Sequence, residues 1–238
     1  MMFMRVLLFC CFLVSLPAVG QDAPISEITI DDADAAARIR SEIAAVEALQ
    51  GLSAETRTSV LEQLRDAEAL LQSKRDADAA AELFASALDT APAETSELRS
   101  VLDAEAPVPE TAESLGIDDS TSLPELQQRL AKETADLTAI DSEVAELNAQ
   151  IEVEVDRPAV ARERIGQLQA SREKLSVRVE EPAIVGEQQM LRDATKVATQ
   201  FRRAAFGSEI NKLEQEILSN AVRLELLRTK LEVAVRSQ

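Results

Sequence analysis

The sequence has no histidine, tryptophan or tyrosine, and its two cysteines, Cys10 and Cys11, are adjacent near the N-terminus. Both lie in an apolar stretch typical of a secretory signal, so we expect the mature chain to lack cysteine as well. A chain without thiol or imidazole groups has no cysteine nucleophile, no serine and histidine pair and no zinc ligand set. Disulfide bonds are excluded for the same reason. We therefore expect no enzyme activity, no metal and no cofactor.

Glycine and aromatic residues are also scarce, at 6 glycines and 3% aromatics in 238 residues. A chain rich in alanine, leucine and glutamate but poor in glycine is typical of long helices and coiled coils. The 25 basic residues are outnumbered by 43 acidic ones, for a formal net charge of −18. Nucleic acids attract clustered basic residues, as anionic lipids do, so we expect neither as a partner. No motif implies a cleft, so we expect no small-molecule substrate.

A cleavable signal peptide is predicted over residues 1–20. One positive charge, at Arg5, precedes an apolar core from Val6 to Leu16, and small residues precede the expected cleavage after Gly20. This core has 11 residues, whereas a bilayer-spanning helix needs roughly 20. We expect export to the periplasm, with residues 21–30 as an extended leader.

Residues 31–103 have helical periodicity and are interpreted as an N-terminal helical hairpin region. The first helix is expected to end at Gly51, and Ser53 is expected to cap the second. Within that second segment, Pro92 either kinks the helix or begins another one. Residues 104–122 are acidic and rich in proline and glycine, and we interpret them as a linker.

Residues 123–238 carry a heptad pattern, which predicts coiled-coil helices. Arg157 and Pro158 are expected to interrupt the pattern, so that three helices fold back on one another as an antiparallel bundle. The fold class is therefore all-α, with long antiparallel helices in a coiled-coil bundle. The inward heptad positions, which we call the seam, are Leu126, Leu130, Leu137, Ile140, Val144, Leu147 and Ile151 in the first helix and Ile210, Leu213, Ile217, Asn220, Leu224, Leu227 and Leu231 in the last.

Asn220 is the polar member of this seam. A buried amide is tolerated where it pairs with a polar partner or fixes the register of a coiled coil, and the alternative is a splayed, partly wet site. Paired carboxylates such as Glu152 with Glu154 could serve as a general acid and base, but among 43 acidic residues such a pair carries little information. We therefore expect Glu152 and Glu154 on a solvated helix face.

The segment INKLEQEILSNAVRLELLR, at residues 210–228, resembles the periplasmic N-terminal domain of large bacterial mechanosensitive channels, the potassium-efflux (MscK-type) members of the MscS superfamily. Looser similarity is found at Leu123–Leu126, at Arg157-Pro158 and at Ala91-Pro92. The resemblance implies a helical region outside the inner membrane, ahead of transmembrane helices and a pore domain that opens under membrane tension. The implied partners are the rest of the channel chain and identical subunits, with membrane contact through downstream helices.

The last helix reaches Gln238 in mid-heptad, without a cap. We therefore expect the coiled coil to continue, and the sequence to be a fragment or a truncated product of a channel of the inner membrane. The alternative is a free periplasmic coiled-coil adaptor or chaperone for envelope proteins. The reading frame beyond codon 238 distinguishes the two, because a channel requires transmembrane helices.

Overall fold

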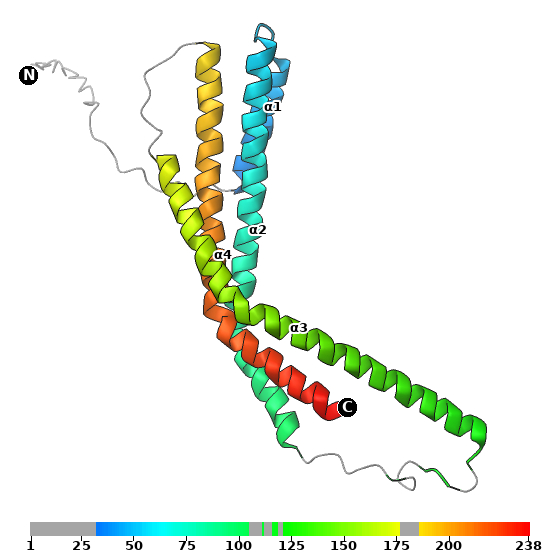
Figure 1. Cartoon of the computed structure of the whole chain (residues 1–238). Helices are drawn as coiled ribbons and strands as arrows, with labels where there is room; N and C mark the ends of the chain where they lie inside the picture. The colour runs from blue at the N-terminus through cyan, green and yellow to red at the C-terminus, as the bar shows by residue number, and fades with distance from the viewer. Residues whose placement is uncertain (1–31, 105–110, 112–115, 119–120, 177–185) are drawn as a thin grey trace, which may run out of the picture. The chain divides into compact units, whose positions relative to one another are not determined.

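The structure is a computed structural model that describes residues 32–104, 111, 116–118, 121–176 and 186–238. These residues form four helices and no strand, namely α1 (Asp32–Ala48), α2 (Ala54–Asp103), α3 (Leu123–Ser176) and α4 (Glu187–Ser237) (Figure 1). The all-α fold class is thereby confirmed. The helices belong to one packed unit, Asp32–Gln238. The predicted signal peptide, the predicted leader and much of the predicted linker lie outside the described residues.

The first two helices form a hairpin at Gly51, whose φ of 107° lies in the left-handed region that glycine adopts without strain. Ser53 caps α2, because its Oγ accepts a hydrogen bond from the Thr56 amide at 3.3 Å. On the hairpin surface, Arg40 of α1 pairs with Glu68 of α2 at 3.1 Å. The cap of the second helix therefore lies where the sequence predicts it, whereas α1 ends at Ala48, three residues before the expected break at Gly51.

Two prolines lie inside helices rather than at their ends. α2 continues through Pro92, and α3 continues through Pro158 over a total of 54 residues. The expected break at Arg157 and Pro158 is wrong, and the described residues after Leu123 form two long helices instead of three. An internal proline removes a backbone hydrogen bond and costs about 3 kcal/mol in an isolated helix. Contacts between α3 and α4 around Pro158 offset part of this cost.

α2 and α4 run side by side in the same direction (Figure 1). The contacts between them advance together along both chains, from Asp66 with Arg202 to Arg99 with Glu225 at 2.5 Å. Buried alanines recur along both helices, and their small side chains favour a close approach of the two backbones. They are Ala67, Ala77, Ala81 and Ala91 of α2 and Ala194, Ala198, Ala205 and Ala234 of α4.

α3 runs antiparallel to α4. Arg164 pairs with Glu209 at 2.9 Å, and the earlier Arg157 pairs with the later Glu216 at 2.7 Å. The antiparallel packing expected for the helices after residue 123 is therefore present between α3 and α4. Because α3 reverses the chain direction between α2 and α4, these two helices become parallel neighbours, which the periodicity of the sequence did not predict.

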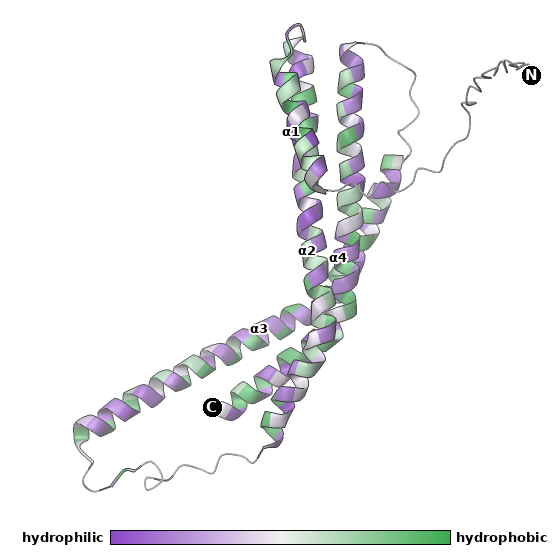
Figure 2. Cartoon of the chain, turned by 180° about the vertical axis from the view of Figure 1, so that it is seen from behind, coloured by the Kyte–Doolittle hydropathy of each residue, from purple (hydrophilic) through white to green (hydrophobic). Residues whose placement is uncertain are grey.

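Buried apolar side chains form two clusters in which larger residues pack with alanines. One lies where α1, α2 and the start of α4 meet and contains Val46, Val60, Leu64 and Ala194. The other joins α3 to α4 and contains Ala161, Leu168, Ile210 and Leu213. Hydrophobic residues form interrupted stripes along each helix (Figure 2). Among the described helices, none has a stretch both long enough and apolar enough to cross a membrane.

Candidate functional site: a buried polar crossing of three helices

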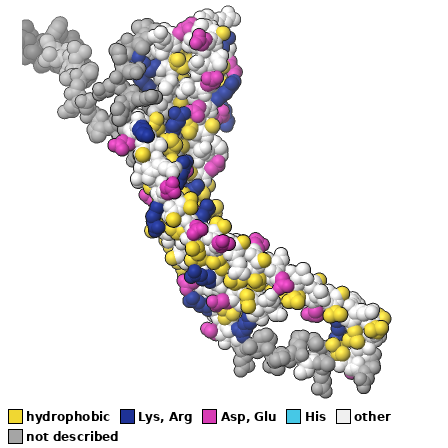
Figure 3. Space-filling view, in the orientation of Figure 1, with side chains coloured by type: hydrophobic (Ala, Val, Ile, Leu, Met, Phe, Trp, Pro, Cys, Tyr) yellow, Lys and Arg dark blue, Asp and Glu magenta, His cyan; other side chains and the backbone are white. Residues whose placement is uncertain are grey.

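The predicted seam residues occupy different environments along the two helices. On α3, Leu147 is buried, Leu126, Ile140, Val144 and Ile151 are half-buried, and Leu130 and Leu137 are exposed. On α4, Ile210 and Leu213 are buried, and Ile217, Asn220, Leu224, Leu227 and Leu231 are half-buried. The structure brings Ile210, Leu213 and Ile217 together against the C-terminal half of α3. Hydrophobic side chains at the N-terminal end of α3 lie at the surface (Figure 3).

A polar site lies where α3 passes Pro158. Proline has no backbone N–H, so the carbonyl oxygen of Glu154, four residues earlier, loses its usual partner in the helix. The side-chain amide of Asn220 on α4 replaces that partner, with Nδ2 donating to the Glu154 carbonyl oxygen at 2.8 Å. The same Nδ2 donates to Glu154 Oε2 at 3.0 Å. Asn220 is therefore paired with a polar partner across the two helices.

Arg223 connects this pair to α2. Its Nη1 donates to Glu154 Oε1 at 2.7 Å, and the two side chains are only 17% and 14% exposed. The guanidinium carbon lies 4.7 Å from the centre of the Phe84 ring, at a distance suited to a cation–π contact. Within α4, Nε donates to Ser219 Oγ at 3.2 Å. One arginine thus contacts side chains from three helices.

A second pair of an acidic and a basic side chain lies next to these contacts along α4. Glu216 is 3% exposed and lies 2.7 Å from Nε of Arg157, which precedes Pro158. This carboxylate oxygen, Oε1, has no partner in hydrogen-bond geometry among the described residues, so the contact is an ion pair rather than a directed bond. We call the set of Phe84, Glu154, Arg157, Glu216, Ser219, Asn220 and Arg223 the polar crossing.

The polar crossing is suited to fixing the register of the helices. Burying charges is costly, and breaking one partner from such a pair typically costs about 3–5 kcal/mol because the remaining charge stays buried. Sliding α4 by one turn, about 5.4 Å, would separate Asn220 and Arg223 from Glu154. The contacts therefore favour one alignment of α3 with α4. Each carboxylate of the polar crossing faces an arginine, Glu154 with Arg223 and Glu216 with Arg157, so both acids have structural partners.

Sequence reasoning identified Asn220 but missed its partners. The expectation that Glu154 lies on a solvated face is wrong, because its carboxylate and its carbonyl oxygen both bind residues of α4. The position of Glu154 relative to Pro158 could have indicated the contact. Glu154 stands four residues before the proline, so its carbonyl oxygen lacks the backbone partner that a helix normally provides. Arg223 follows Asn220 by three residues and so lies on the same helix face.

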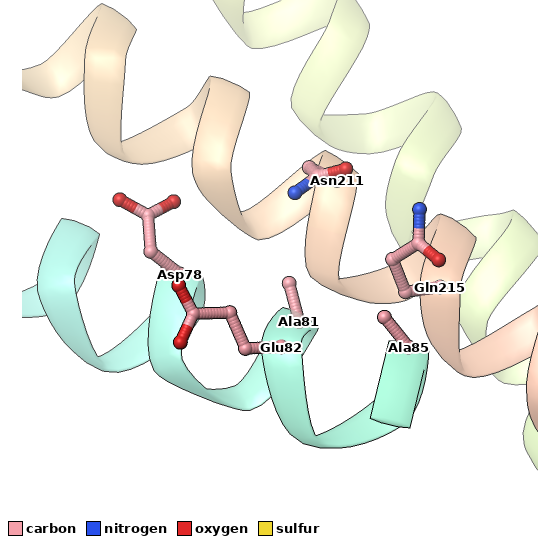
Figure 4. Close-up of a pocket in the computed structure, with 6 residues that line it drawn as sticks. All are labelled: Asp78, Ala81, Glu82, Ala85, Asn211 and Gln215. Carbon is pink, nitrogen blue, oxygen red and sulfur yellow. The ribbon is translucent and has the colours of Figure 1, made fainter. Parts of the chain in front are cut away.

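A pocket of about 360 Å³ opens between α2 and α4. Figure 4 shows Ala81 and Ala85 on its α2 side, with the amides of Asn211 and Gln215 on α4. Burial raises the pKa of nearby Asp78, but hydrogen bonds from Lys74 and Ser208 outweigh this and hold the pKa below its ordinary value. Asp78 is therefore ionised at neutral pH and is a poor proton donor. Its Oδ2 lies 2.8 Å from Lys74 Nζ, so the acid already has a structural partner.

A polar contact also joins the N-termini of α2 and α4. Glu187 Oε2 accepts hydrogen bonds from the hydroxyls of Ser53 and Thr56, each at 2.8 Å, and Oε1 accepts from the Ser53 amide at 3.0 Å. These donors lower the pKa of Glu187 below its ordinary value, the Ser53 hydroxyl having the largest effect. No cluster of three or more potential metal ligands occurs in the part of the chain that the structure describes.

Comparison with known protein families connects this helical unit to a class of membrane proteins. The model of the mechanosensitive ion channel porin domain matches residues 42–238. The chain belongs to the mechanosensitive ion channel porin domain family. This porin domain is the periplasmic helical domain of MscK-type channels, so the resemblance drawn from residues 210–228 is confirmed. The family is associated with channels and is not an enzyme family. No curated protein and no solved structure matches the chain.

Proposed function

We propose that this porin domain is a periplasmic scaffold of a mechanosensitive channel. It would space the channel from the cell envelope and pack around it or against identical subunits, while the pore and membrane-spanning helices belong to other segments of the channel chain. The observation that carries this proposal is the family match over residues 42–238, which takes in most of α1 and all of α2, α3 and α4.

The dimensions of the helices suit a spacer. α2 has 50 residues and α4 has 51, and at 1.5 Å per residue each is about 75 Å long. Helices of this length rely on packing for stability, and the parallel contact of α2 with α4 supplies it. The polar crossing opposes sliding of α3 along α4, because sliding would leave Glu154 and Arg223 buried without partners. A displacement at one end of this unit would therefore be carried to the other end.

The proposed location is the periplasm, with export by the signal peptide predicted over residues 1–20. The cleaved signal, the leader over 21–30 and the linker over 104–122 are parts of the same proposal. The domain would meet the inner membrane through the rest of the channel, since no described helix has the length and apolarity to cross it.

Cell fractionation tests this proposal. For this test, an epitope tag is inserted into the native gene at the codon for Ser73, an exposed residue of α2. Cells that express the tagged chain are then converted to spheroplasts. We expect the tagged chain to remain with the inner membrane, to require detergent for release, and to be cut by trypsin in spheroplasts but not in intact cells. Release into the osmotic-shock fluid would overturn the channel role and favour the free periplasmic adaptor. Retention in the cytoplasm would contradict both roles.

A further inference from the structure

The charge of the chain is distributed unevenly. Although the net charge is −18, the C-terminal part of α3 (residues 157–176) and the N-terminal part of α4 (residues 187–212) together carry ten basic and five acidic residues. Several of these residues already pair with one another or with α2, namely Arg157 with Glu216, Arg164 with Glu209 and Arg202 with Asp66. Two more of the acids accept hydrogen bonds from glutamines, namely Glu163 from Gln167 and Asp193 from Gln189. The excess of positive charge therefore belongs to the other basic residues.

Four of these basic residues lie on the surfaces that α3 and α4 turn toward each other. The apolar cluster between the two helices ends at Leu168 on α3 and at Phe206 on α4. Continuing each seam by the same steps of three and four residues gives basic side chains at four of the next six positions. These six positions are Arg172 and Leu175 on α3 and Arg203, Thr199, Lys196 and Arg192 on α4.

The register of the two helices brings some of these residues to one level. In the two ion pairs that join α3 to α4, the residue numbers add to 373, so Arg172 lies level with residue 201 of α4. On α4, Lys196 lies about one turn before Thr199, and Arg203 lies about one turn after it. Three cations and one hydroxyl therefore share this end of the contact. We call Arg172, Lys196, Thr199 and Arg203 the basic cluster.

The cations of the basic cluster have no partners in the part of the chain that the structure describes. Arg172, Lys196 and Arg203 are exposed, and no hydrogen bond or ion pair joins their side chains to another described residue. One turn before Lys196, Nη2 of Arg192 is buried and also has no hydrogen-bond partner. A buried N–H without an acceptor is destabilising, so an oxygen acceptor at this end of α4 would stabilise it.

We propose that the basic cluster binds a phosphate group. Like charges at opposing seam positions repel, so Arg172 and Arg203 weaken the contact of α3 with α4 unless an anion lies between them. The planar guanidinium group donates two parallel hydrogen bonds to phosphate oxygens, and lysine adds a point charge. The Thr199 hydroxyl would donate a further hydrogen bond. A carboxylate has a single charge and two oxygens, so it would satisfy fewer of these donors.

Titration calorimetry of the full chain tests the proposal. Sodium phosphate is added to the protein at neutral pH, and sodium chloride keeps both solutions at the same ionic strength, so that general screening does not contribute. We expect saturable binding with a dissociation constant on the order of 1 mM, because the cations are exposed to water. Absence of saturation up to about 30 mM phosphate would overturn the proposal.

Single substitutions test which residues bind the phosphate. Arg172→Gln and Arg203→Gln should each weaken binding about 10-fold, and Thr199→Val should weaken it about 3-fold. The control Arg38→Gln, at an exposed position of α1, removes the same charge and should keep the affinity within about 2-fold of the parent. Equal weakening by the control would indicate attraction by overall charge and overturn the site. Circular dichroism checks that each variant keeps its helicity.

A stability measurement separates binding from a structural role of Arg172. Arg172→Leu removes the repulsion with Arg203 and extends the apolar series of α3. Without phosphate, this variant should melt about 2–5 °C above the parent. It should also lose the rise in melting temperature that phosphate gives the parent. A lower melting temperature without phosphate would show that Arg172 stabilises the helices by itself, and this result would overturn the proposal.

Two sources share this chemistry, a phosphate ion in solution and the headgroup of a phospholipid. Sedimentation with vesicles of phosphatidylcholine, with or without about 30% phosphatidylglycerol, distinguishes them. Cosedimentation that requires phosphatidylglycerol and is lost in Arg203→Gln would identify the headgroup as the source. Phosphate binding without cosedimentation would identify the free ion, and binding to neither probe would overturn the proposal. These outcomes do not depend on the channel role, which the fractionation experiment tests separately.

Discussion

The contact between Asn220 and the helix around Pro158 predicts a measurable coupling between these two residues. Asn220→Leu removes both hydrogen bonds to Glu154 while keeping the same number and branching of side-chain heavy atoms. Pro158→Ala acts on the other side of the same contact, because alanine restores the backbone N–H that the Glu154 carbonyl oxygen lacks. The two substitutions should therefore not be additive, and the double variant should be more stable than the sum of the single effects indicates.

The magnitude can be worked out from the two bonds. Loss of the 2.8 Å bond to the carbonyl oxygen leaves a half-buried acceptor unpaired, at about 1–2 kcal/mol. Loss of the 3.0 Å bond to the carboxylate costs about 1.5 kcal/mol, and the added leucine surface returns about 1 kcal/mol. Asn220→Leu should therefore cost about 2 kcal/mol in the parent. In the Pro158→Ala background the carbonyl contribution disappears, so the cost should fall by about 1 kcal/mol.

Urea denaturation followed by circular dichroism at 222 nm measures the four corners of this cycle. The control cycle combines Asn220→Leu with Pro92→Ala, which restores a backbone N–H in α2 at a site distant in sequence from Glu154. The control should be additive within about 0.5 kcal/mol. A coupling between Pro158 and Asn220 no larger than the control coupling would refute the argument that the amide substitutes for the missing helix bond.

Three further predictions concern packing and pH. Ala67 is fully buried, so Ala67→Leu should destabilise the fold by about 1–3 kcal/mol through overpacking, whereas Ala69→Leu on the exposed face should be nearly neutral in the same denaturation assay. Leu168 is 2% exposed, so Leu168→Ala should lower the free energy of unfolding by about 2–5 kcal/mol. The control Leu218→Ala, at an exposed position, should lower it by less than about 0.5 kcal/mol. Equal losses for the two variants would contradict the packing of α3 on α4. The pKa of Glu187 is lowered from 4.5, so its contribution to stability is present above that pH and is lost as the pH falls through the lower folded value. Melting temperatures between pH 3 and 7 should therefore fall less steeply on acidification in Glu187→Gln than in the parent.

Local signals in the sequence predicted the helices well. Gly51 forms the turn after α1 and Ser53 caps α2, because a left-handed backbone and an N-cap depend on a few adjacent residues. The prolines were harder to interpret, because whether a helix continues through Pro158 depends on contacts between distant residues, such as Glu154 and Asn220, which are 66 residues apart in the chain. Periodicity identified Asn220 as inward and polar, yet it could not identify Glu154 as its partner.

By itself, the sequence determined the all-α class, the approximate limits of the helices, the acidic surface and the family, since each depends on composition, short-range backbone chemistry or a run of matching residues. The tertiary structure alone decided that α2 and α4 lie parallel, that α3 is one helix through Pro158, and that Glu154 and Arg223 are buried together. Leu130, Leu137 and Leu147 all belong to the heptad seam of α3. Only the tertiary structure decided that Leu147 is buried, whereas Leu130 and Leu137 have no partner among the described helices. The physical reason is that periodicity states which face of a helix is apolar, whereas the element that covers that face depends on how distant segments pack.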